Sequence, residues 1–125
     1  MVIPPNILVV EDDRFLSKAY QAKLSKEGLA VTAALDGEEA IKAVSQAVPD
    51  VILLDLMLPK KNGFEVLEAI RKDARLAAVP VIILSNLGQD SDIERGKALG
   101  AVDYLVKTNV KLDGVLQKIK QYLPK

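Results

Sequence analysis

The sequence contains no cysteine and no histidine among its 125 residues. Without cysteine there is no disulfide framework and no thiolate to act as nucleophile or metal ligand. Without histidine the protein lacks the commonest general base and metal ligand, so any chemistry must use carboxylates, lysine or hydroxyl groups. These absences leave few reactive side-chain types to consider.

An excess of charge of either sign is also lacking, because Lys+Arg and Asp+Glu both number 17. The balance gives no global basic field, so we expect no direct binding of nucleic acid. The first residues lack the apolar core of a signal peptide, and no run approaches membrane-spanning length, so we expect no membrane association and a cytoplasmic location. With half its residues hydrophobic, the chain is expected to form a single domain over residues 1–125.

Apolar runs of strand length alternate with amphipathic stretches of helix length along the whole chain. We predict strands at 6–10, 30–34, 51–54, 81–84 and 102–106, and helices at 14–27, from 36 to before Pro49, near 64–73, at 90–99 and at about 111–123. This alternation is typical of a parallel sheet covered by helices on both faces. The predicted fold class is α/β, a doubly wound five-stranded parallel sheet with five helices.

The sequence also predicts how several helices begin and pack. Asp13 and Asp36 are expected to cap the helices that follow them, with Glu39 three residues after Asp36. Spacing predicts two buried helical stripes. The first comprises Phe15, Leu16, Ala19, Tyr20 and Leu24, and the second comprises Leu112, Val115, Leu116, Ile119 and Leu123.

Four predicted strands are followed by polar side chains that together form a candidate site. Glu11, Asp12 and Asp13 follow the first strand, Asp55 follows the third, Ser85 the fourth and Lys107 the fifth. A charge at the end of a buried strand is costly unless it is paired. In parallel α/β sheets ligands bind at this edge, so we expect these side chains to converge.

The combination of Glu11-Asp12, Asp55-x-x-x-Pro59, Gly63, Ser85, Tyr104 and Lys107 resembles the receiver domain of response regulators, the CheY-like phosphoacceptor module of two-component signalling. Each motif alone is weak, whereas the set in this order and spacing is highly specific. The resemblance covers essentially the whole chain. It implies the flavodoxin-like strand order 2-1-3-4-5, which the periodicity does not establish.

By this resemblance Asp55 accepts a phosphoryl group. A carboxylate is a poor nucleophile toward a dianionic donor, so a divalent cation, Mg²⁺ or Mn²⁺, is implied. Its direct ligands would be Asp12, Asp55 and the backbone carbonyl of Met57, with Glu11 acting through a water. The donor would be the phosphohistidine of a sensor histidine kinase or phosphotransfer protein, or a small acyl phosphate. The domain would catalyse only its own phosphotransfer and dephosphorylation, rather than act as an enzyme.

The resemblance also assigns Lys107, Ser85 and Tyr104. Lys107 would pair with Asp55 at rest and with a phosphoryl oxygen after transfer, while Ser85 would donate a hydrogen bond to another. Movement of Ser85 would let Tyr104 swing inward. The surface formed by residues 90–99, 102–106 and 111–123 would then change shape and bind a downstream protein or a second copy.

Three residues depart from the family pattern. Thr108 replaces the proline usual after the lysine, so the peptide bond between residues 107 and 108 is either trans with a rearranged loop or a strained cis bond. Asn86 replaces a small alanine. Met57 is apolar where some relatives carry polar groups that position hydrolytic water, which predicts slow self-dephosphorylation.

Plainer explanations remain open for single residues and for the whole chain. The acids at 11–13 alone would be a capping cluster, Ser85 a loop residue and Tyr104 ordinary packing. An alternative function is a pseudo-receiver that binds partners without phosphorylation. An aspartate-nucleophile phosphatase or a flavin carrier on a similar sheet is disfavoured, because Met57 stands where the phosphatase needs a second aspartate and acids stand where flavin needs a phosphate loop.

Overall fold

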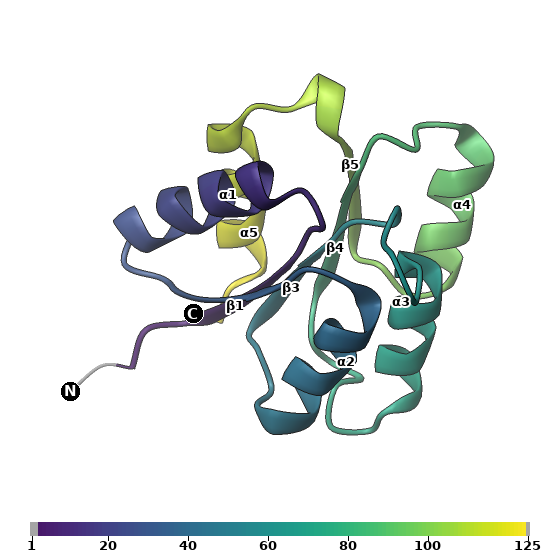
Figure 1. The fold of residues 1–125 in the computed structure, drawn as a ribbon, viewed down its shortest axis with the longest axis horizontal. Coiled ribbons are helices and arrows are strands. Elements are labelled where there is room, and N and C mark those ends of the chain that lie inside the picture. Colours follow the sequence, from purple (N-terminus) through teal and green to yellow (C-terminus); the bar gives the residue numbers. More distant parts are fainter. Residues whose placement is uncertain (1–2, 125) are drawn as a thin grey trace.

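The computed structural model describes residues 3–124 as alternating strands and helices (Figure 1). The strands are β1 (Asn6–Val10), β2 (Ala30–Ala34), β3 (Val51–Leu54), β4 (Val81–Ser85) and β5 (Asp103–Val106). The helices are α1 (Arg14–Lys26), α2 (Gly37–Gln46), α3 (Gly63–Lys72), α4 (Asp90–Ala98) and α5 (Leu112–Tyr122), with a short 3₁₀ turn at Lys107–Asn109. None of the helices within the described range is long and apolar enough to cross a membrane.

All neighbouring strands run parallel, in the order β2-β1-β3-β4-β5. This confirms the expected doubly wound sheet and its order. The register aligns Val10 with both Ala34 and Leu54, and Ser85 with Val106. The carboxyl ends of the strands therefore meet at one edge of the sheet, and the residues that follow them are neighbours.

Helices cover both faces of the sheet, α1 and α5 on one and α2, α3 and α4 on the other (Figure 1). Strands β1, β3 and β4 are buried on both sides, so apart from Asn6 and Ser85 at their ends they consist of apolar residues without polar alternation. Their side chains divide between the two cores. Leu8, Ile52 and Ile83 face α2 and α3, whereas their neighbours Ile7, Leu53 and Ile82 face α1 and α5.

The two predicted helix caps are confirmed. Asp13 Oδ1 accepts a hydrogen bond from the amide of Leu16 (3.0 Å), and Asp36 Oδ1 accepts one from the amide of Glu39 (2.8 Å). A further cap escaped the sequence analysis, in which 60–63 is only a turn. Asn62 and Glu65 form a reciprocal capping box at the start of α3, with distances of 3.0 and 3.3 Å.

Two residues of the predicted apolar stripes are exposed, which corrects those assignments. Phe15 is 81% exposed, because α1 is rotated so that Ser17, Tyr20 and Leu24 face the sheet. Phe15 lies two positions, about 200°, from Ser17 around the helix and so points to solvent. Leu112, the first residue of α5, is 40% exposed, whereas the rest of that helix packs as expected through Val115, Leu116 and Ile119.

Candidate functional site

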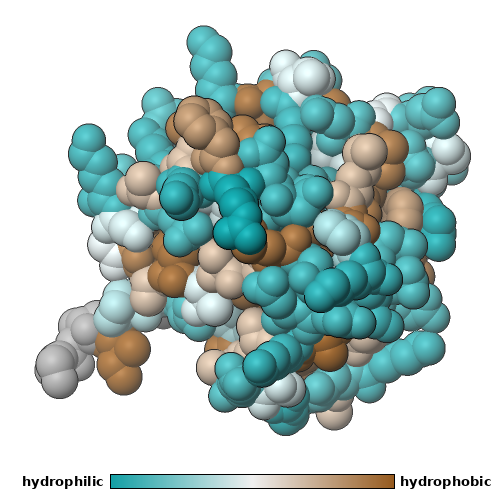
Figure 2. Space-filling model, in the orientation of Figure 1, coloured by the Kyte–Doolittle hydropathy of each residue, from teal (hydrophilic) through white to brown (hydrophobic). Residues whose placement is uncertain are grey.

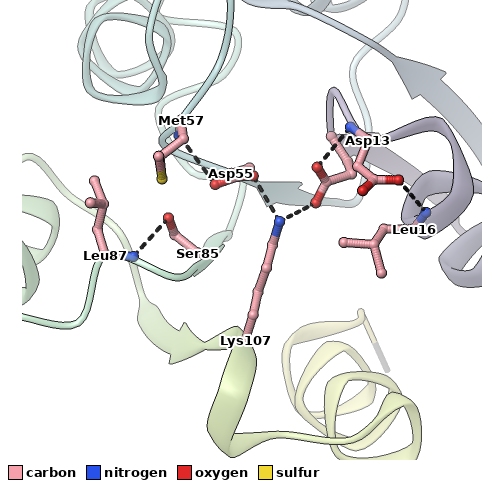
Figure 3. A network of polar contacts seen from close by, with 8 residues as sticks. Asp13, Leu16, Asp55, Met57, Ser85, Leu87 and Lys107 are labelled. Atoms are coloured by element: carbon pink, nitrogen blue, oxygen red, sulfur yellow. Dashed lines mark hydrogen bonds and ion pairs between the residues drawn. The ribbon is translucent and has the colours of Figure 1, made fainter.

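The polar residues that follow the strands do converge at the carboxyl edge of the sheet (Figure 3). Glu11 follows β1 and Asp55 follows β3, and these strands are aligned so that the two acids are adjacent. Both carboxylates are almost fully buried, with exposures of 2% for Glu11 and 4% for Asp55. Buried charges of one sign require a counter-charge.

Lys107 supplies that counter-charge from the end of β5. Its ammonium lies 2.5 Å from Glu11 Oε1 and 2.8 Å from Asp55 Oδ2 (Figure 3). Only 13% of the lysine side chain is exposed, so these are sheltered ion pairs rather than surface ones. The sequence analysis assigned Lys107 to Asp55 alone, and the contact with Glu11 adds a second partner. That contact depends on how far the lysine reaches across the sheet, which spacing does not reveal.

The protonation preferences follow from burial and from these pairs. Burial raises the pKa of the Glu11 carboxyl above its usual value, and the nearby Asp55 charge adds to this, while Lys107 opposes both. For Lys107, burial alone would lower the pKa, but the hydrogen bonds and charges of Asp55 and Glu11 outweigh it and leave the pKa raised. The ammonium is therefore held in its charged form between the two acids.

Asp12 completes a cluster of three carboxylates with Glu11 and Asp55. One oxygen from each lies within 4.8 Å of the others, and Asp12 is exposed, which leaves the cluster open to solvent. One ammonium does not neutralise three carboxylates. Hard oxygen ligands with excess negative charge suit Mg²⁺ or Mn²⁺, so the donor set fits the expected divalent cation.

The main chain after β3 bends back to Asp55. The amide of Met57 donates to Asp55 Oδ1 (3.2 Å), opposite the oxygen that Lys107 contacts (Figure 3). The Met57 side chain is 57% exposed and leaves the region around Asp55 without a further polar group from this position. Each oxygen of Asp55 therefore has one fixed donor.

Ser85 and Tyr104 meet through a residue that the sequence analysis did not single out. Leu87 donates its amide to Ser85 Oγ (3.3 Å), and its carbonyl accepts a hydrogen bond from the Tyr104 hydroxyl. Tyr104 is buried at 9% exposure, with its ring beside Gly96 of α4. Burial, then the charges of Asp92 and Asp55, raises the pKa of Tyr104 to about 12. Leu87 makes both contacts through its backbone, so the identity of its side chain could not have indicated this role in the sequence.

Thr108 sits in the 3₁₀ turn after Lys107, and the peptide bonds described by the structure are all trans. Of the two alternatives for the bond between residues 107 and 108, the trans bond is the one present. The turn still brings the lysine to the acids. Asn86 and Thr108 are both exposed and lie at the rim of the site, and neither forms a hydrogen bond with the Asp55 carboxylate.

A groove of about 390 Å³ opens beside the site between α1 and the segment that joins β5 to α5. Lys107 and Asn86 lie at its polar end, and Phe15, Val110 and Leu112 contribute apolar lining. The two residues that break the predicted apolar stripes, Phe15 and Leu112, thus belong to the same surface. The face drawn in Figure 2 is mostly hydrophilic, with patches of hydrophobic residues between the hydrophilic ones.

The family description "response regulator receiver domain" matches residues 7–120 of the chain. The chain belongs to this family of two-component signalling domains. Among curated relatives it is 43% identical over 103 residues to the DNA-binding dual master transcriptional regulator RpaA of Synechocystis, covering 82% of this chain and 43% of that protein. The chain thus spans less than half the length of this relative, and 39 to 50% of the length of other curated relatives that it matches.

Solved structures agree with this assignment. The chemotaxis protein CheY4 of Vibrio cholerae superposes with a TM-score of 0.90 at 28% identity, covering 97% of this chain and 100% of that one. The BeF₃-activated receiver domain of Klebsiella pneumoniae RstA superposes with a TM-score of 0.87 at 28% identity, covering 96% and 99%. The receiver domain is therefore similar in fold both to a chemotaxis protein and to the receiver part of a longer regulator.

Proposed function

We propose that this receiver domain is a phosphorylation-controlled switch whose phosphoacceptor is Asp55. The observation that carries the proposal is the setting of its carboxylate. It is buried, its Oδ2 contacts the ammonium of Lys107, its Oδ1 accepts from the amide of Met57, and Glu11 and Asp12 lie beside it. This setting supports the proposal, because positive charge and fixed hydrogen-bond donors lie beside the carboxylate that a phosphoryl group would join.

In the proposed reaction a carboxylate oxygen of Asp55 attacks the phosphorus of a phosphohistidine. A phosphorus–oxygen bond forms as the phosphorus–nitrogen bond breaks, the nitrogen keeps that electron pair, and the imidazole takes a proton from solvent. Lys107 moves from a carboxylate oxygen to a phosphoryl oxygen, and Ser85 donates to another. The aspartyl phosphate is later hydrolysed by water.

Asp12, Asp55 and the Met57 backbone carbonyl would hold Mg²⁺ or Mn²⁺, with Glu11 joined through a water. The bound cation would offset the repulsion between an anionic nucleophile and an anionic donor. Without it, three carboxylates and one lysine leave the site negatively charged. We therefore expect the transfer to depend on a divalent cation.

The proposed switch runs from Ser85 through Leu87 to Tyr104. Phosphorylation adds close to two negative charges at Asp55, and Ser85 Oγ would leave the amide of Leu87 to donate to them. Tyr104 already lies inward and holds the Leu87 carbonyl, so the segment between β4 and α4 would rearrange around a tyrosine that is in place. The surface of α4, β5 and α5 would then bind a downstream protein or a second copy.

The groove beside Lys107 supports a protein donor, a sensor histidine kinase or phosphotransfer protein. A phosphohistidine that reaches Asp55 must come from a partner resting on the adjoining surface, and Phe15 offers an exposed aromatic anchor there. We expect Phe15→Ala to slow transfer from a phosphorylated histidine phosphotransfer protein by at least about fivefold. The rate with acetyl phosphate should not change.

Val48→Ala is the matched control for that test, because Val48 is 47% exposed and lies outside the groove. It should leave both rates unchanged. Equal loss in Phe15→Ala with the protein donor and with acetyl phosphate would mean that the phenylalanine serves the chemistry or the fold, not docking.

The decisive test of the phosphoacceptor is intact mass measurement after incubation with acetyl phosphate and Mg²⁺. The wild type should gain the mass of one phosphoryl group, and Asp55→Asn, which keeps the size of the side chain, should gain none. Omission of Mg²⁺ should abolish the gain. A wild type that stays unmodified would favour the pseudo-receiver, which binds partners without phosphorylation.

A further inference from the structure

The start of α2 lies against the loop that follows Asp55, with no room for a side chain between them. Gly37 is the first residue of α2, and a β-carbon there would lie 2.0 Å from the carbonyl oxygen of Lys61 and 2.6 Å from its β-carbon. Real β-carbons do not approach other atoms closer than 3.0 Å. Since the Lys61 oxygen belongs to the main chain, any larger residue at position 37 must displace the loop or the helix.

Polar contacts hold the same two segments together. The amide of Gly37 donates to the Pro59 carbonyl (3.4 Å), which also accepts from the amide of Lys61 (2.8 Å). Lys60 adopts a left-handed backbone (φ 67°), uncommon for a residue with a β-carbon. Its ammonium lies 3.6 Å from the carboxylate of Asp36, the residue that caps α2. The loop is thus joined to the start of α2 by a main-chain hydrogen bond and an ion pair.

The other end of the loop is held by a second close approach. A β-carbon on Gly63 would lie 2.3 Å from the carbonyl oxygen of Asp55 and 2.5 Å from the α-carbon of Leu56. The amide of Gly63 donates to the Leu56 carbonyl (2.9 Å). Met57 lies between these two points, and its amide is the one that contacts Asp55 Oδ1. The place of the Met57 main chain therefore depends on how the loop packs at both ends.

We infer that Gly37 is a positioning residue for phosphoryl transfer at Asp55. Because Gly37 has no side chain, the loop after Asp55 can pack directly against the start of α2, and the residue acts through the position of this loop. The inference rests on the proposed function. A methyl group at position 37 would shift the Lys61 main chain and, with it, the Met57 amide and the carbonyl proposed as a cation ligand. A misplacement of about 1 Å costs on the order of 100-fold in rate when it alters a reacting geometry. Both cation binding and transfer should fall.

The test compares Gly37→Ala with Gly114→Ala. Both positions lie in the first turn of a helix and gain the same methyl group, but a β-carbon on Gly114 would meet only the Cγ2 of Val110 (2.8 Å), the end of a side chain. Mg²⁺ affinity is measured by calorimetry, and the rate of phosphorylation by acetyl phosphate by intact mass at saturating Mg²⁺. Gly37→Ala should lose about tenfold or more in each. Gly114→Ala should stay within about twofold of the wild type.

A merely structural role for Gly37 predicts a different result. Gly37→Ala would then unfold at lower temperature yet bind Mg²⁺ and accept the phosphoryl group as the wild type does, which would overturn the inference. Should Gly37→Ala fail to fold, Lys60→Asn is the second variant, because asparagine tolerates the left-handed backbone but lacks the ammonium. It should lose about two- to fivefold in Mg²⁺ affinity and rate, and wild-type values would overturn the inference.

The outcome also separates this inference from the proposed function. If the wild type accepts no phosphoryl group, the proposed function fails, while the Mg²⁺ affinities of the two glycine variants still test the positioning. If the wild type is phosphorylated and Gly37→Ala equals Gly114→Ala in both measurements, only the positioning fails.

Discussion

Helices α3 and α4 lie side by side on one face of the sheet but are held very differently. Helix α3 begins at a complete capping box and buries Gly63, Phe64, Val66, Leu67 and Ile70. Helix α4 has no side-chain cap at Gln89, and Gly96 is its only buried residue. Helix α3, which follows the loop after Asp55, is packed into the core along one face, whereas α4, on the proposed output surface, buries a single residue. A switch needs this combination, because the element that moves must be less stable than the site that drives it.

Two arginines link α3 to α4 and to the residues just after it. The Arg95 guanidinium of α4 lies 4.0 Å from the centre of the Phe64 ring at the start of α3. At the other end, Arg71 of α3 donates to the carbonyl of Gly100, just after α4, from Nε (3.1 Å) and Nη2 (2.9 Å). These polar contacts tie α4 to α3 near both of its ends, in addition to the packing of Ile93 against the core.

The largest expected difference comes from matched truncations in the two helices. Ile70→Ala in α3 should cost about 2–5 kcal/mol of the free energy of unfolding, because Ile70 is 1% exposed and its removal leaves a cavity. Ile93→Ala in α4 should cost about 1 kcal/mol or less, because Ile93 is only partly buried. Urea unfolding measures both. Equal losses would show that α4 is as firmly packed as α3.

Removal of the Arg71 side chain should come next in size. Arg71→Met should cost about 1–3 kcal/mol, because the guanidinium also donates to the carbonyls of Leu76 and Val79, which would lose their partner. Hydrogen exchange should accelerate more at the end of α4 than in α3. Arg75→Met is the control, since Arg75 pairs with Asp73 at a half-exposed position and should cost less than about 1 kcal/mol. Uniform acceleration across both helices would contradict a local link.

The capping difference gives a smaller test. Asn62→Ala should cost about 1 kcal/mol, because it removes the oxygen that accepts from the amide of Glu65. Gln89→Ala should change the free energy of unfolding by less than about 0.5 kcal/mol, because Gln89 makes no side-chain cap. Thermal or urea unfolding of the two variants measures the difference. If Gln89→Ala lowered the free energy of unfolding as much as Asn62→Ala does, the two helices would not differ in capping.

Alkaline pH gives the mildest perturbation of the region near α4. Because burial raises the pKa of Tyr104 from 10.0 to about 12, the folded state favours the neutral phenol. The stability from this preference is fully present below pH 10.0 and is lost as the pH rises through about 12. Ultraviolet titration of phenolate should show a late step that Tyr104→Phe lacks. Its persistence in Tyr104→Phe would assign it to Tyr20, whose pKa burial also raises.

Much of the site could be predicted from the sequence because its residues follow strands. In a parallel sheet the carboxyl ends of the strands share one edge, so the strand positions predicted that Glu11, Asp12, Asp55 and Lys107 lie at the same edge, while the order of the strands decided which of them are adjacent. The caps at Asp13 and Asp36 were equally accessible, since a cap depends on residues three apart in the chain. The roles of these residues in transfer stay a prediction until phosphorylation is measured.

Other features were decided only in three dimensions. The spacing of Phe15 fits an apolar stripe as well as Leu16 does, but the rotation of α1 against the sheet leaves Phe15 in solvent. The contacts of Leu87 with Ser85 and Tyr104 use its backbone, which is the same in every residue. The fit of Gly37 against Lys61 joins segments that are separated by a whole strand and helix.

The sequence by itself determined the strands, the helices, their order along the chain and the polar side chains at the carboxyl edge of the sheet, because these follow from periodicity and from neighbours close in the chain. Tertiary structure alone decided the rotation of α1, the pairing of Lys107 with two acids, the shallow burial of α4 and the close packing of the loop after Asp55. Each of those depends on distances between segments far apart in sequence, which packing sets and local pattern does not encode.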